Sequence, residues 1–273
     1  MSVGYYVEVE ENINIYVEDL NPKGKKTIVF LHGWPGSHKL FEYQFDQLPK
    51  MGYRCIGIDQ RGFGKSDKPF TGYDYNRLAD DVKAVIEALD LKNVILSGHS
   101  TGGAIAIRYM ARHNEARVSK LALFAAAAPS LIKRSYFPYG LEKKDVDDII
   151  KGTYDDRPKM LRDFGNMFFF QHITEAFSEW FFQLGLEAAG WSTASVANSW
   201  LNEEGLFSDL EKINVPTLIL HGIHDKVCLF PLAQAQTQGI RNSKLIAFES
   251  SGHGLFYDQK EKFNKELIQF IEE

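Results

Sequence analysis

The chain has 273 residues, of which 44% are hydrophobic and 25% are charged, and its formal net charge at pH 7 is −5. This length and composition are typical of one large globular α/β domain with an insertion, and they exclude a disordered or membrane-embedded chain. The acidic balance argues against nucleic acid as a partner, because no basic excess is available to hold phosphates.

Targeting signals and disulfides are not expected. The first 20 residues contain no basic segment followed by an apolar one, so we predict no secretory signal. The longest apolar run, 121–128, stops at Pro129 and is too short to cross a bilayer. The two cysteines, Cys55 and Cys228, are too few for a disulfide framework. We therefore expect a cytoplasmic protein with no membrane partner.

The first predicted elements are strands. Residues 5–11 and 13–19 alternate between apolar and polar side chains, which predicts two antiparallel strands joined by a tight turn. Residues 26–31 and 53–58 are almost wholly apolar, as are strands of a parallel sheet that is buried on both faces. The sheet thus begins with an antiparallel pair and continues with parallel strands.

A loop follows each of these two apolar strands. The first loop reads HGWPG from His32, and its backbone can face a reaction centre at the end of the sheet. The second loop, DQRGFG from Asp59, has glycines typical of tight turns, and we expect Asp59 and Arg61 to pair with each other there. We assign the second loop a structural role, and we expect the His32 side chain to brace the first.

The serine of GHSTG, residues 98–102, is the candidate nucleophile. An apolar strand at 93–96 precedes it, and a helix is expected from Thr101 onward. Glycines on both sides of a serine permit the tight turn that holds it in a strained conformation between strand and helix. A glycine-rich loop with no catalytic role would show the same sequence pattern, so the assignment of Ser100 as the nucleophile depends on its partner residues.

Further apolar runs at 120–124, 217–220 and 244–248 complete a predicted sheet of eight strands, and the stretches at 78–89, 105–110 and 263–271 have helical periodicity. Alternation of strand and helix predicts a doubly wound α/β fold with a mostly parallel sheet. Residues 130–213 carry many aromatics and no clear strand. We therefore predict a core domain, 1–129 and 214–273, into which a helical cap, 130–213, is inserted.

The partners that a serine nucleophile needs follow the last two strands. His253 lies between glycines after the strand at 244–248 and is the candidate base. Asp225 follows the strand at 217–220 and is the acid expected to orient that imidazole. His221 and His224 precede Asp225, but this spacing matches no metal-ligand motif, so we expect neither metal nor cofactor. The backbone N–H groups of Trp34 and Thr101 are the expected oxyanion donors.

These motifs together resemble the α/β-hydrolase fold family. The matching segments are HGWPGS, IDQRGFGKSD, the long stretch from Ala79 to Gly103, YMARHNEARVSKLAL, VPTLILHGIHD and SSGHGLF, which cover most of the chain outside the cap. More narrowly, they are similar to its cofactor-free haloperoxidase and aryl-esterase branch. The resemblance implies a triad of Ser100, Asp225 and His253 that hydrolyses small or aryl esters. It also implies a side activity in peracid formation, which in that branch accompanies a proline at the place of Pro35.

The substrate pocket and the alternatives depend on the cap. Aromatic residues above a nucleophile suit an apolar cavity, and we expect Trp34, Pro35, Phe164, Phe168, Trp180 and Phe181 to line it. The same exposed aromatics would equally serve a homo-oligomer interface. Lactonase and amidase chemistry use the same triad, and a receptor that binds a small molecule without fast turnover is the alternative outside enzymes.

Overall fold

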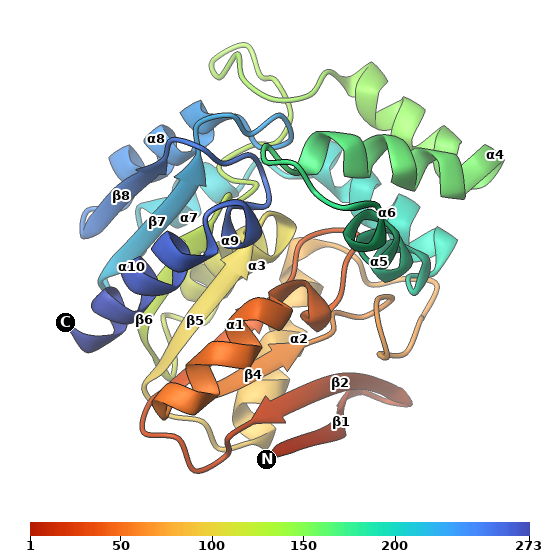
Figure 1. The fold of residues 1–273 in the computed structure, drawn as a ribbon. Coiled ribbons are helices and arrows are strands. Elements are labelled where there is room, and N and C mark those ends of the chain that lie inside the picture. Colours follow the sequence, from red (N-terminus) through yellow and green to blue (C-terminus); the bar gives the residue numbers. More distant parts are fainter.

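The computed structural model of the protein describes residues 1–273, and its centre is an eight-stranded sheet (Figure 1). The strand order is β1-β2-β4-β3-β5-β6-β7-β8; β1 and β2 are antiparallel to their neighbours, and all other pairs are parallel. The strands are β1 (Ser2–Glu10), β2 (Ile13–Leu20), β3 (Thr27–Leu31), β4 (Arg54–Ile58), β5 (Val94–His99), β6 (Val118–Phe124), β7 (Thr217–Gly222) and β8 (Ser243–Phe248). The predicted fold class is confirmed.

Burial of the strands explains their sequence patterns. Every residue of β5 and of β7 is buried, because helices cover both faces of the sheet there, and apolar runs result. β1 lies at the edge, and most of its residues are exposed or half-buried. β5 continues beyond the predicted end at residue 96 as far as His99. The strand therefore runs directly into the serine turn.

Two layers of helices enclose the sheet (Figure 1). One layer contains α1 (Glu42–Gln47), α9 (Leu255–Asp258) and α10 (Lys260–Glu272), and the other contains α2 (Tyr75–Ala88), α3 (Thr101–Arg112) and α8 (Phe230–Gly239). Short 3-10 turns, η1 (His38–Phe41) and η2 (Leu48–Met51), flank α1. Asp74 caps the N-terminus of α2, because its carboxylate accepts the N–H groups of Asn76 and Arg77. No helix is long and apolar enough to span a membrane.

The segment between β6 and β7 is helical. It contains α4 (Lys143–Phe168), α5 (Glu175–Leu186), α6 (Gly190–Asn202) and α7 (Leu206–Leu210). α4 is interrupted at Asp156, which has φ −154° and ψ 75°, just before Pro158, a residue that cannot donate to the helical ladder. α4, α5 and α6 lie together beyond one end of the sheet, whereas α7 packs on α3 and α8 (Figure 1). These four helices fall within the predicted cap, whose limits at 130 and 213 stay a prediction.

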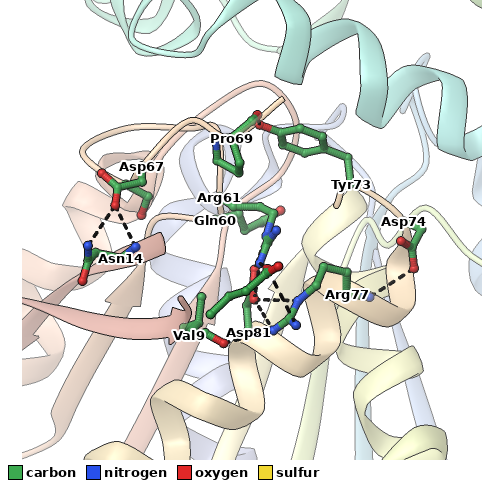
Figure 2. A network of polar contacts seen from close by, with 12 residues as sticks. Val9, Asn14, Gln60, Arg61, Asp67, Pro69, Tyr73, Asp74, Arg77 and Asp81 are labelled. Carbon is green, nitrogen blue, oxygen red and sulfur yellow. Dashed lines mark hydrogen bonds and ion pairs between the residues drawn. The ribbon is translucent and has the colours of Figure 1, made fainter. Parts of the chain in front are cut away.

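The expected pairing of Asp59 with Arg61 is wrong. Arg61 points toward α2, where its guanidinium binds Asp81 through two hydrogen bonds of 2.6 and 2.8 Å (Figure 2). Asp59 points the other way and accepts the N–H and the ring nitrogen of His38 at 2.7 and 2.8 Å. Both side chains are fully buried, so each needs a partner of its own, and successive parts of the loop are fixed to different elements.

Candidate active site

Ser100 occupies a strained turn between β5 and α3. Its backbone has φ 54° and ψ −123°, a conformation that non-glycine residues rarely adopt. The flanking glycines are required by close approach: a Cβ on Gly98 would lie 2.3 Å from the Gly102 carbonyl oxygen, and one on Gly102 would lie 2.4 Å from that of Leu31. The sequence GHSTG therefore encodes a serine that stands at the carboxyl end of the central strand.

The Ser100 hydroxyl has an unexpected neighbour in Cys228. The Ser100 Oγ lies 3.9 Å from the Cys228 Sγ, and both residues are buried. Burial raises the pKa of the Cys228 thiol well above its ordinary value, so this sulfur stays protonated. Sequence reasoning did not assign Cys228 a place in the site; its position three residues after Asp225 was the available signal.

His253 and Asp225 form a buried pair. The His253 Nδ1 lies 2.8 Å from the Asp225 Oδ2, and neither side chain is accessible to solvent. A carboxylate can only accept, so Nδ1 carries the proton and Nε2 presents its lone pair. The Nε2 atom is buried and makes no hydrogen bond within the protein. It is available to take a proton.

Three further groups hold the Asp225 carboxylate. Its Oδ1 accepts the N–H groups of Val227 and Cys228, each at 2.8 Å, and the His221 Nε2 lies 3.4 Å from Oδ2. Burial by itself raises the pKa of Asp225, but the His253 and His221 imidazoles outweigh it and hold that pKa below its usual value. Cys228 thus contacts Asp225 through its backbone and Ser100 through its side chain, and Asp225 in turn contacts His253.

The turn after β3 adjoins Ser100 and contains a backbone N–H that has no partner. The Gly33 carbonyl accepts hydrogen bonds from the His32 Nδ1 and from the Gly36 N–H, both at 2.9 Å. In a trans peptide the next N–H, that of Trp34, points the opposite way, and it has no partner within the protein. A Cβ on Gly33 would lie 2.9 Å from the Ser100 Cβ, so this peptide adjoins the serine.

The tautomer of His32 is set by Gln60. The Gln60 backbone N–H donates to the His32 Nε2 at 3.0 Å, and its side-chain amide donates to the His32 carbonyl at 2.5 Å. Since Nε2 accepts, the proton must be on Nδ1, where it binds the Gly33 carbonyl. Burial lowers the pKa of His32, which keeps this neutral form. His32 therefore lies where a brace of this turn was expected.

Thr101 supplies a second free N–H. It is the first residue of α3, where backbone N–H groups have no intrahelical acceptor and the helix dipole favours negative charge. Its side-chain Oγ1 is also buried without a partner. The two N–H groups without a partner thus come from the turn after β3, at Trp34, and from the first residue of α3, at Thr101.

His99 contacts both the backbone and the ring of His253. Its Nε2 lies 3.0 Å from the His253 carbonyl oxygen and therefore carries a proton, and the two rings are 4.4 Å apart. Burial and the nearby His253 lower the pKa of His99 well below its ordinary value. His99 is a neutral buried imidazole that fixes the backbone of His253.

The loop that carries His253 is attached to the cap at the turn between α4 and α5. The Asp258 carboxylate accepts the N–H of Gly252 at 2.8 Å and those of Phe170 and Gln171 at 3.0 Å each. The Gly254 N–H donates to the Phe168 carbonyl at 2.9 Å. Because these bonds join residues 168–171 to residues 252–254, the base and the cap are held in one arrangement.

A cavity of about 90 Å³ opens onto Ser100. Of the predicted pocket residues, Trp34 and Phe164 line it. Residues that were not predicted complete its walls: Leu131, Leu141, Ile149, Met167, Trp200, Lys226 and Val227. It adjoins an outer cavity of about 400 Å³ along α4, with which it shares Trp34, Ile149, Phe164 and Met167. The pocket is thus built jointly from the cap and the strand-end loops.

The other predicted pocket residues lie elsewhere. Pro35, Phe168 and Phe181 line a separate cavity of only about 20 Å³, which also touches Trp34 and Phe164. Trp180 lines neither cavity; its ring packs 5.0 Å from that of Phe177. Phe181 turns inward to Phe168, and Trp180, one residue earlier, is rotated about 100° around the helix. The helical phase of α5 therefore turns Trp180 away from the three cavities described above, and its place in the substrate pocket stays a prediction.

No group of three or more histidine, cysteine, aspartate or glutamate side chains is placed to hold a metal ion. His224 stacks on Phe170 with ring centroids 4.0 Å apart, and His221 donates to the Cys228 carbonyl at 2.6 Å. The two histidines before Asp225 therefore have separate structural partners.

Comparison with known proteins gives consistent matches along the whole chain. Residues 26–142 match the model of the alpha/beta hydrolase fold family. The "AB hydrolase superfamily protein YisY" of Bacillus subtilis is 50% identical over 98% of this chain and 99% of its own. The "Bifunctional esterase/perhydrolase DCH" of Acinetobacter calcoaceticus is 31% identical over 97% of this chain and 99% of its own.

Two solved structures share the fold closely. An esterase from Exiguobacterium antarcticum has a TM-score of 0.96 and 44% identity, with 99% of this chain and 100% of that chain covered. A bromoperoxidase from Bacillus anthracis has a TM-score of 0.94 and 32% identity, with the same coverage of 99% and 100%. At these identities over nearly the full length, the two structures resemble this chain in sequence as well as in fold.

Proposed function

The chain belongs to the α/β-hydrolase fold family, in its branch of cofactor-free haloperoxidases and esterases, and from that premise we propose that it hydrolyses small or aryl carboxylic esters through Ser100, His253 and Asp225. It is a hydrolase, as are the esterases among its relatives. The observation that carries the proposal is the buried pair of His253 and Asp225, whose Nδ1 and Oδ2 atoms are 2.8 Å apart. This pair leaves the His253 Nε2 without a partner, and the same site contains a serine in a strained turn.

In the proposed first step the Ser100 Oγ attacks the acyl carbon of the ester. Its proton passes to the His253 Nε2, while Asp225 keeps the Nδ1 proton in place and stabilises the imidazolium. The carbonyl oxygen becomes an oxyanion and is bound by the N–H groups of Trp34 and Thr101. The bond to the alcohol then breaks, and the leaving oxygen takes the proton from His253.

The second step reverses these roles with water. Water gives a proton to His253 and attacks the acyl carbon, and the oxyanion forms again between the same donors. The bond between the acyl carbon and the Ser100 Oγ then breaks, Oγ takes the proton back from His253, and the carboxylic acid leaves. Hydrogen peroxide in place of water would give a peracid instead. The relative named as a bifunctional esterase/perhydrolase and the presence of Pro35 favour that side activity. Lactones and amides would enter by the same steps.

The test is hydrolysis of p-nitrophenyl esters, from acetate to octanoate, by the wild type and by Ser100→Ala. We expect many turnovers per enzyme by the wild type, loss of turnover in the variant, and a preference for short acyl chains because the cavity at Ser100 is small. Peracid formation from acetate and hydrogen peroxide is measured in parallel. A folded wild type that binds esters but does not turn them over would favour the receptor alternative and contradict the proposal.

A further inference from the structure

The turn that carries Asp225 begins where β7 ends, at Gly222, and its last residue, Cys228, contacts β7 again. Three residues of this turn are exposed: Ile223, His224 and Lys226. Exposed turns have few packing contacts to hold them in place. The Asp225 carboxylate is nevertheless buried and lies 2.8 Å from the His253 Nδ1, so its position depends on how the two ends of the turn are held.

Backbone hydrogen bonds hold the first end of the turn. The Ile223 N–H donates to the Phe248 carbonyl at 3.1 Å. The His224 N–H donates to the Ser251 carbonyl, also at 3.1 Å. These two bonds join the start of the turn to the end of β8 and to the loop that carries His253.

A side chain holds the far end of the turn. The His221 Nε2 lies 2.6 Å from the Cys228 carbonyl oxygen, and because a carbonyl can only accept, Nε2 carries the proton. The His221 Nδ1 is buried with no partner, which agrees with a proton on the other nitrogen. His221 belongs to β7, all of whose residues are buried. The bond therefore joins the last residue of the turn to a fixed strand.

The same imidazole nitrogen lies beside the carboxylate of the turn. The His221 Nε2 is 3.4 Å from the Asp225 Oδ2, the oxygen that is also 2.8 Å from the His253 Nδ1. The other carboxylate oxygen, Oδ1, accepts the N–H of Cys228 at 2.8 Å. His221 therefore binds the carbonyl of the residue whose N–H binds the carboxylate, and the contacts form a closed, buried network.

We propose that His221 is a positioning residue for the proposed triad: its Nε2–H fixes the Cys228 carbonyl and thereby the direction in which the Asp225 carboxylate meets His253. This inference rests on the proposed function. His221 does not line the cavity at Ser100, so it has no expected contact with substrate. Loss of its N–H should therefore lower kcat and leave KM nearly unchanged.

Two substitutions by unbranched side chains of the same length separate the donor from the volume that it fills. In His221→Gln the amide nitrogen takes the place of Nε2, whereas His221→Met has no donor. For p-nitrophenyl acetate we expect His221→Met to lower kcat about tenfold with KM within about twofold, and His221→Gln to restore kcat to within about threefold of the wild type.

His224→Phe is the matched control. His224 lies in the same turn, is exposed, and stacks on the Phe170 ring, a contact that a phenylalanine would retain. We expect kcat and KM of this variant to stay within about twofold of the wild type, because exposed positions away from the network contribute little.

A double-mutant cycle tests whether His221 acts through Asp225. His221→Met is combined with Asp225→Asn, and the rate at which a fluorophosphonate phosphonylates Ser100 is measured in the wild type, the two single variants and the double variant. This reaction is a single covalent event and can be followed in slow variants. We expect His221→Met to lower the rate about tenfold in the wild type but less than about twofold in the Asp225→Asn background.

A measurement on the wild type applies even where His221→Met does not fold. In protein labelled with ¹⁵N-histidine, NMR should show the proton of His221 on Nε2 and that of His253 on Nδ1. The spectrum of His221→Gln assigns the His221 signal by its loss. A proton on the Nδ1 of His221 would overturn the inference.

Three kinetic results would also overturn it: a folded His221→Met variant with the kcat of the wild type, a His221→Gln variant as slow as His221→Met, or equal losses in the two backgrounds of the cycle. Each of these results leaves the proposed function intact, because the wild type still hydrolyses the ester. Absence of both hydrolysis and phosphonylation in the folded wild type would instead overturn the proposed function itself.

Discussion

The strand-end loops and the cap meet above Ser100, and they hold their charged groups in opposite ways. In the loops, Asp225, His253 and His32 are fully or almost fully buried, and their partners include backbone groups fixed by the turns. In α4, lysines pair with aspartates one turn away on an exposed surface, as in Lys151–Asp155. Buried networks leave a group unsatisfied when one member is lost, whereas exposed pairs contribute little.

The strand-end loops and the cap differ in what they contribute: we expect the loops to determine catalysis and the cap to determine substrate selectivity. In the proposed mechanism the loops supply the oxyanion donors and the base, and close backbone approach, such as that of Gly33 to Ser100, holds them in place. The cap contributes side chains to the walls, such as Phe164 and Trp200, and no group to the proposed chemistry. Substitutions in the loops should therefore lower kcat, and those in the cap should change KM and the ranking of substrates.

Asp225→Asn should have the largest effect. The asparagine retains an oxygen for the N–H groups of Val227 and Cys228, but it favours the wrong tautomer of His253. We expect kcat for p-nitrophenyl acetate to fall about 10⁴-fold with little change in KM. A loss smaller than tenfold in a folded variant would contradict the role of Asp225 as the residue that orients the base.

His32→Phe, which has no donor for the Gly33 carbonyl, tests the orientation of the proposed oxyanion donor. Without the bond from Nδ1 to the Gly33 carbonyl, the Gly33–Trp34 peptide is free to rotate, and the Trp34 N–H loses its direction. We expect kcat to fall about 10²-fold, because one oxyanion donor is worth about that much. His113→Phe is the matched control at the far end of α3, and kcat should remain within twofold there.

Asp258→Asn tests the attachment of the cap to the histidine loop. One carboxylate oxygen is replaced by an amide group, so at least one of the N–H groups of Gly252, Phe170 and Gln171 loses its acceptor. A lost buried acceptor costs about 1–3 kcal/mol, and we expect kcat/KM to fall about tenfold with both kcat and KM changed. An effect on KM alone would show that the hydrogen bonds of the Asp258 carboxylate do not position His253.

The buried imidazoles predict the pH dependence of stability. Burial lowers the pKa of His32, and burial together with His253 lowers that of His99, from an ordinary value of 6.5. The unfolded chain therefore takes up protons below about pH 6.5 that the folded chain does not, so stability is complete above that pH and declines below it. Each histidine contributes a slope of up to about 1.4 kcal/mol per pH unit.

His99→Phe removes one of these two histidines. The difference in free energy of unfolding between pH 7.5 and pH 5.5, measured by urea denaturation, should be smaller in this variant than in the wild type. An equal or larger difference in the variant would show that His99 is not the source of the slope.

Lys151→Ala should have the smallest effect. It breaks an exposed i,i+4 pair with Asp155 on the outer side of α4. We expect the free energy of unfolding to change by at most about 0.5 kcal/mol and kcat/KM to stay within twofold. A larger change in kcat/KM would mean that the charges of the outer cavity take part in substrate entry.

Much of the fold follows from sequence for a clear physical reason. Strands buried on both faces leave short apolar runs, and tight turns at their ends leave glycines, so Ser100, Asp225 and His253 could each be placed at a strand end. The end of β5 was placed three residues early because Ser97 and Gly98 interrupt the apolar run, although both are buried. Consecutive aromatics do not reveal the helical phase of α5, so the sequence does not distinguish Trp180 from Phe181, which turns inward to Phe168.

Contacts between distant segments could not be predicted. The Asp258 carboxylate binds the N–H of Phe170, more than 80 positions away in the sequence. The partner of Arg61, Asp81, lies on α2 rather than in the same loop as Arg61. Lys226 resembles an ordinary loop residue, and only the fold brings it to the wall of the cavity at Ser100. For Cys228 the one signal is its position three residues after Asp225, and only the fold brings its sulfur to 3.9 Å from the Ser100 Oγ.

The most direct test of the proposed nucleophile is covalent labelling. The wild type is incubated with a fluorophosphonate, which phosphonylates an activated serine, and the mass of the intact protein and of its peptides is measured. We expect a single adduct, on Ser100, which forms faster in the wild type than in the Asp225→Asn variant. An adduct on Cys228, the nucleophile 3.9 Å away, or no adduct at all on folded enzyme would contradict it.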